Sequence, residues 1–166
     1  RVPLLHEAAD DGRIAGDNAG CFPDLAQHSR RTPLAIVFTD PNIASVGASF
    51  AELTAAKCDF GIGEVDFSTQ GRARVLRRNH GLLRVYGERG TGRLLGAELI
   101  GPRAEHLAHL LAWAVQMGID AETALAMPFY HPVIEEGLRT ALRDLSANLG
   151  TRPEPPPHNI DCGPGA

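Results

Sequence analysis

The chain has 166 residues, of which 43% are hydrophobic and 22% charged, and its formal net charge is −4. This size suffices for one hydrophobic core, and one domain is the default expectation. The acidic balance argues against nucleic acid and an anionic membrane as partners, and no apolar run approaches the ~20 residues of a membrane span.

The first predicted element is a helix over residues 4–19. Small and apolar residues recur along one side of it at helical spacing, which predicts close packing against another element. These residues are Leu4, Leu5, Ala8, Ala9, Gly12, Ala15 and Ala19. Glycine, proline and serine in residues 20–33 then predict a linker.

The middle of the chain predicts strands. Short runs of β-branched, aromatic and leucine residues are bounded by turn-forming residues, and the glycines of segment 88–92 favour a hairpin between two of the runs. The predicted strands are 34–38, 43–46, 59–66, 81–86 and 93–100.

Several helices accompany these strands. Ser49 followed by Glu52 is the capping-box pattern and predicts a helix that ends near Lys57. Leucine and alanine periodicity predicts further helices over 103–117, 120–127 and from Pro132 to about residue 148. The predicted fold class is α+β, an antiparallel sheet of four or five strands with helices on one face.

Two groups of polar residues have alternative interpretations. Four arginines in residues 68–78 are compatible with an anion site, but a solvated face that offsets nearby acids is favoured. His106 and His109 are three residues apart, as metal ligands can be. No carboxylate or cysteine completes a set at known spacing, so we predict no metal site.

The most informative stretch runs from Met127 to Leu138. Pro132 suits the first position of a helix, which predicts His131 as the capping residue. A carboxylate on the first turn, Glu136 or Glu135, could then bond one ring nitrogen of His131 and leave the other available. An imidazole oriented by a carboxylate is a common general acid/base. The alternative is a histidine that only caps the helix.

Other signals bear on context. Three cysteines, Cys21, Cys58 and Cys162, lie far apart and suit a reducing cytoplasm. No signal peptide is visible, and a start at Arg1 instead of methionine indicates part of a longer protein. No GxGxxG motif follows a strand and no close cysteine pair occurs, so we expect neither a dinucleotide-binding unit nor a redox disulfide within these residues.

Three stretches, in order, resemble the flavin-dependent pyridine nucleotide-disulfide oxidoreductases. FYHPVIEEGLRTALRDL resembles their C-terminal signature, in which His-Pro, three residues and Glu fall on His131, Pro132 and Glu136. VFTDPNIASVG (37–47) resembles the opening of their interface domain. PLLHEAADDG (3–12) resembles the helix after their second flavin-binding motif. The likeness covers about residues 1–148 and is strongest to dihydrolipoyl dehydrogenases.

The resemblance implies a domain organisation. Residues 1–20 would be a helix from the end of the flavin domain, 21–33 a linker, 34–148 the dimerisation domain and 149–166 a flexible tail rich in proline and glycine. The full-length enzyme would be a homodimer that uses FAD and NAD and oxidises dihydrolipoyl groups on a carrier protein. We expect no cofactor bound to this chain alone, and no activity from it.

The resemblance also implies roles for individual residues. His131 and Glu136 would form the acid/base pair, and His131 and Pro132 would face the flavin of the partner subunit. Backbone groups of Leu4, Leu5 and His6 would lie near the flavin of their own subunit. The alternatives are a reductase of the glutathione reductase type that uses NADPH, and a stand-alone dimerisation module without chemistry. The lone Cys162 argues against a mercuric reductase.

Overall fold

The computed structural model describes residues 4–150, which divide into two compact units, 4–31 and 32–150. The first unit holds the helix α1 (Leu5–Gly20) and the segment after it. No residue of α1 is buried. Arg30 pairs with Glu7 and Asp11, and Arg31 pairs with Asp10. Ion pairs therefore hold the segment against its helix, although they are exposed and each contributes little stability.

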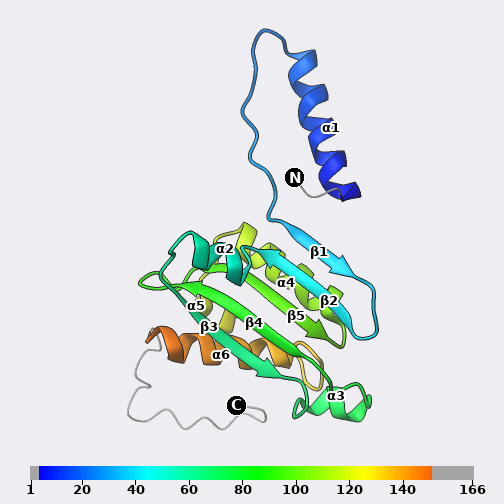
Figure 1. Ribbon diagram of the computed structural model, residues 1–166, viewed down its shortest axis with the longest axis vertical. Helices are drawn as coiled ribbons and strands as arrows, with labels where there is room; N and C mark the ends of the chain where they lie inside the picture. The colour runs from blue at the N-terminus through cyan, green and yellow to red at the C-terminus, as the bar shows by residue number, and fades with distance from the viewer. Residues whose placement is uncertain (1–3, 151–166) are drawn as a thin grey trace. The chain divides into compact units, whose positions relative to one another are not determined.

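The second unit is built on a five-stranded sheet (Figure 1). All neighbouring strands are antiparallel, in the order β1-β2-β5-β4-β3. The strands are β1 (Leu34–Val37), β2 (Asn42–Gly47), β3 (Phe60–Asp66), β4 (Leu82–Glu88) and β5 (Leu94–Gly101). The predicted α+β class and its antiparallel sheet are confirmed.

Five helices belong to this unit. They are α2 (Phe50–Ala55), α3 (Gly71–Val75), α4 (Ala104–Gln116), α5 (Ala121–Leu125) and α6 (Glu136–Leu149). Helix α3 lies within the arginine-rich segment, where no helix was predicted. No helix within residues 4–150 is long and apolar enough to cross a membrane. The predicted flexible tail lies outside the described residues from position 151 onwards.

The core lies between one face of the sheet and two long helices. Helix α4 packs on β1, β2 and β5, and α6 packs on β3 and β4. Alternate strand residues such as Leu83, Val85 and Leu99 are buried between them. Gly63 brings α6 close to β3, because a Cβ there would overlap the backbone of Ala141. The glycine is therefore required for helix-to-sheet contact.

The capping box predicted for α2 is present. The Ser49 hydroxyl accepts from the Glu52 N–H at 3.3 Å, and the Glu52 carboxylate accepts from the Ser49 N–H at 2.9 Å. Hydrogen bonds from the backbone and then the hydroxyl of Ser49 lower the pKa of Glu52. Both residues lie within one turn, so sequence spacing alone was enough to predict this contact.

The predicted start of the last helix was wrong. Helix α6 begins at Glu136 with Glu135 as its capping residue, and His131 and Pro132 lie before it in a turn. The peptide bond between His131 and Pro132 is cis. The cause of the later start is Val133, whose N–H and carbonyl bond to side chains instead of to helix backbone. The first helical hydrogen bonds use the carbonyls of Ile134 and Glu135.

Candidate functional site

His131 and Glu136 meet at the N-terminal end of α6. The His131 Nδ1 lies 2.8 Å from the Glu136 Oε1, within hydrogen-bond distance. The His131 side chain is 68% exposed, whereas that of Glu136 is only 22% exposed. The contact predicted from sequence therefore exists, with an accessible imidazole on a partly buried carboxylate. Glu135, the neighbouring candidate, occupies the N-cap position of α6 without a side-chain capping bond, and the carboxylate that bonds His131 is that of Glu136.

The contact selects one tautomer of the ring. An ionised carboxylate only accepts hydrogen bonds, so a neutral His131 must carry its proton on Nδ1. The lone pair of Nε2 is then left to accept a proton. No hydrogen-bond partner for Nε2 occurs among residues 4–150. This arrangement can take a proton from an incoming group, and the carboxylate then stabilises the charged ring.

The carboxylate of Glu136 has a second partner that fixes its orientation. Its Oε2 accepts from the Val133 N–H at 3.0 Å, while Oε1 faces His131. Partial burial alone would raise the pKa of Glu136, but the hydrogen bonds from His131 and Val133 and the charges of His131 and Arg139 outweigh it. The net effect is a lowered pKa. Glu136 is therefore an ionised partner for His131 at neutral pH.

Sequence reasoning missed one residue next to this pair. Gln70, the capping residue of α3, donates from Nε2 to the Val133 carbonyl at 2.8 Å. The two residues are 63 positions apart. The only local signal was a glutamine before a short segment of helix-forming residues, and that signal indicates a cap at most.

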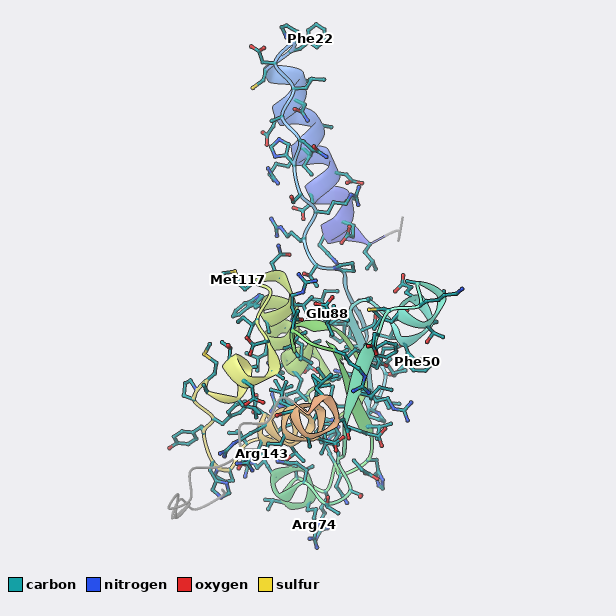
Figure 2. The ribbon with its side chains drawn as sticks, turned by 90° about the vertical axis from the view of Figure 1, so that its left-hand side faces the viewer. Phe22, Phe50, Arg74, Glu88, Met117 and Arg143 are labelled. Atoms are coloured by element: carbon teal, nitrogen blue, oxygen red, sulfur yellow. The ribbon has the colours of Figure 1, made fainter. Side chains whose placement is uncertain are left out.

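An apolar groove of about 460 Å³ adjoins the turn that carries His131. Its walls come from α4, α5, the turn around His131 and the first half of α6. Several large apolar side chains there are exposed, including Trp113 at 66%, Met117 at 75% and Tyr130 at 80%. Figure 2 shows Met117 at the end of α4. An apolar surface of this kind is typical of a contact with another protein surface.

The start of α1 holds the other predicted binding residues. Leu4 is the capping residue, and the first helical bond runs from the Ala8 N–H to the Leu4 carbonyl at 3.0 Å. Within the described part of the chain, the N–H groups of Leu5 and His6 have no hydrogen-bond partner. These N–H groups can donate hydrogen bonds to an oxygen of a ligand. Their approach to a flavin stays a prediction.

The remaining polar groups do not join this site. Arg78 pairs with Asp40 at 3.0 Å beside a cavity of about 350 Å³, and Arg74 lies on α3 (Figure 2). The His109 ring bonds the Glu105 carbonyl of its own helix. Across residues 4–150, no three His, Cys, Asp or Glu side chains are grouped so that they could hold a metal ion.

Comparisons with known proteins agree with this fold. Residues 34–142 match the family described as pyridine nucleotide-disulphide oxidoreductase, dimerisation domain. Dihydrolipoyl dehydrogenase of Haloferax volcanii is 33% identical over 138 residues, which are 83% of this chain and 29% of that protein. The human mitochondrial dihydrolipoyl dehydrogenase is 27% identical over 147 residues, 89% of this chain and 28% of that protein.

Solved structures of other proteins have the same fold. LpdA from Mycobacterium tuberculosis superposes with a TM-score of 0.74 at 28% identity, over 86% of this chain and 31% of that one. The flavoprotein disulfide reductase RclA from Escherichia coli shares the fold, with a TM-score of 0.75 at 21% identity over 86% of this chain and 32% of that one. The chain thus spans under a third of the relatives it matches. The chain belongs to the pyridine nucleotide-disulphide oxidoreductase family, in which its residues 34–142 correspond to the dimerisation domain.

Proposed function

We propose that this chain is the interface part of a flavoprotein disulfide oxidoreductase that oxidises dihydrolipoyl groups. The observation that carries the proposal is the His131–Glu136 pair, with Nδ1 bonded at 2.8 Å and Nε2 open to solvent. The relatives named dihydrolipoyl dehydrogenase support this choice of substrate. The expected partner is a lipoyl-bearing carrier protein, and the expected compartment is the cytoplasm.

His131 supplies the proton transfer in the proposed reaction. Nε2 takes the proton of a substrate thiol, which leaves a thiolate as the nucleophile that disulfide exchange requires. The thiolate forms a bond to one sulfur of an enzyme disulfide, and the other sulfur leaves as a thiolate. Glu136 holds the ring in the correct tautomer and stabilises its positive charge.

The cofactors would be held mainly by domains outside these residues. FAD and NAD supply the electron transfer when bound. In this chain the N–H groups at the start of α1 suit a flavin oxygen, because they are donors at the positive end of a helix of 16 residues. Leu5 and His6 would provide those N–H groups, next to the capping residue Leu4. His131 and Pro132 would face the flavin of the partner subunit.

The groove between α4, α5 and the His131 turn is the surface we assign to subunit contact. Only 5% of the chain is aromatic, yet Trp113 and Tyr130 are both largely exposed there. Burial of such side chains gives most of the binding energy in many protein interfaces. Contact through this groove would also bring His131 close to the partner subunit, as a shared site requires.

Light scattering of the chain across a dilution series tests this assignment. We expect the mass of a dimer, twice 17.7 kDa. Trp113→Glu should shift the mass to that of a monomer, because the interface would bury an unpaired charge. Val75→Glu is the matched control, since Val75 is 71% exposed on α3, away from the groove. A dimer that persists in Trp113→Glu would place the contact elsewhere.

Substrate choice is tested on the flavoprotein that contains this chain. We expect NAD to be reduced with dihydrolipoamide, and oxidised glutathione to be a poor substrate with NADPH. The reverse preference would assign the protein to the glutathione reductase type. If neither pair of substrates reacts while the flavin is bound, a dimerisation module without chemistry becomes the better description.

A further inference from the structure

Gln70 uses both ends of its side-chain amide. Its Oε1 accepts from the Ala73 N–H at 2.6 Å and caps α3, while its Nε2 donates to the Val133 carbonyl at 2.8 Å. The two partners fix which end is oxygen and which is nitrogen, because an N–H can only donate and a carbonyl can only accept. Gln70 therefore connects the start of α3 to the turn that carries His131.

The backbone of Val133 links Gln70 to Glu136. Its carbonyl is held by Gln70, and its N–H is bonded to the Oε2 of Glu136 at 3.0 Å. With Oε2 held there, Oε1 is turned towards the Nδ1 of His131. The chain of contacts thus runs from Gln70 through the backbone of Val133 to the carboxylate that orients the imidazole.

Packing beneath the turn supports the same arrangement. Phe67 is fully buried in the connection that leads to Gln70. A Cβ at Gly137 would lie only 2.8 Å from the Phe67 ring, so the ring lies directly against the first turn of α6. The Gln70 bond to Val133 is itself partly buried. Water cannot easily replace a bond in such a place, which makes the bond effective as an anchor.

We propose that Gln70 is a positioning residue, which orients Glu136 towards His131 by holding the backbone of Val133. Gln70 itself does not contact the imidazole. The role in catalysis rests on the proposed function. The effect of Gln70 on the His131–Glu136 contact can be measured in this chain without an activity assay.

The test compares Gln70→Asn and Gln70→Ala in the 166-residue chain by carbon NMR of the Glu136 carboxyl group. Asparagine is a preferred capping residue, so it keeps the α3 cap, but it is one methylene shorter and cannot also reach Val133. We expect the pKa of Glu136 to rise towards its ordinary value in both variants. The His131 ring signals should also stop following the Glu136 titration.

Gln116→Asn is the matched control. The Gln116 side chain accepts from the Thr32 N–H, so this variant also shortens a glutamine that bonds to backbone. It should leave the Glu136 titration unchanged. An unchanged titration in both Gln70 variants would overturn the proposal. A change seen only in Gln70→Ala would overturn it as well, because loss of the α3 cap would then be the cause.

Kinetics of the flavoprotein separate this proposal from the proposed function. Gln70→Asn should lower kcat with dihydrolipoamide, and it should add no further loss when combined with His131→Ala, since both act through one pair. If His131→Ala alone leaves turnover intact, the acid/base function fails. The NMR titration still decides whether Gln70 positions the pair.

Discussion

His131→Ala should lower the turnover of the flavoprotein with dihydrolipoamide by about 10²–10⁴-fold, the range typical for loss of a general acid/base. The reason is the geometry at Nε2, which is exposed and carries the lone pair because Nδ1 is bonded to Glu136 at 2.8 Å. The measurement is steady-state kcat with dihydrolipoamide and NAD. Flavin content and the dimer mass should stay as in the unaltered protein, because the side chain is on the surface.

His109→Ala provides the matched control for this variant. His109 is also an exposed histidine, but its ring bonds the Glu105 carbonyl on α4 and does not contact His131. Its loss should leave kcat within about twofold, as expected for a surface position with small effects. Equal turnover in His131→Ala and His109→Ala would remove His131 from the proton transfer.

Phe67→Ala should have the largest effect on stability. The side chain is fully buried between Gly101 and Gly137, where its ring fills the space that both glycines leave. Truncation of a buried phenylalanine typically costs about 3–5 kcal/mol, because apolar contact is lost and a cavity remains. A domain of this size has about 5–15 kcal/mol in total. Urea unfolding followed by circular dichroism measures the difference.

Phe38→Ala makes the same change on the surface. Phe38 is 79% exposed, so its removal should alter the free energy of unfolding by less than about 0.5 kcal/mol. Comparable losses for the two variants would mean that Phe67 does not have the packing role described here. The slope of the urea transition should be similar in both, since neither changes the surface exposed on unfolding by much.

Local signals predicted most of the fold. The capping box of Ser49 and Glu52 lies within one turn, and the hairpin between β4 and β5 is closed by glycines at its tip. Short runs of β-branched, aromatic and leucine residues between turn-forming residues predicted the strands, because such side chains fit a half-buried sheet surface. Each of these features depends on residues that are neighbours in the chain, so the sequence displays them directly.

Two elements needed the tertiary structure. Helix α3 has only five residues, too few for a periodic pattern, and is capped by a glutamine that also bonds Val133. The start of α6 was predicted at Pro132 from its preference for a first helical position. The structure places that start at Glu136. The Val133 carbonyl accepts from the Gln70 side chain and the Val133 N–H donates to the Glu136 carboxylate, so neither group is part of the helix.

The sequence by itself determined the order along the chain of the strands and of every helix but α3 and, with the family resemblance, the pairing of His131 with Glu136. His131 and Glu136 are five positions apart, so the glutamate side chain can reach the imidazole wherever the helix begins. Only the tertiary structure decided how the pair is held, through Gln70 and Phe67, and where the apolar groove lies. The contacts of Gln70 with Val133 and of Phe67 with Gly137 join residues more than 60 positions apart. The chain carries no local pattern for them, because their energy exists only once the sheet and α6 have packed.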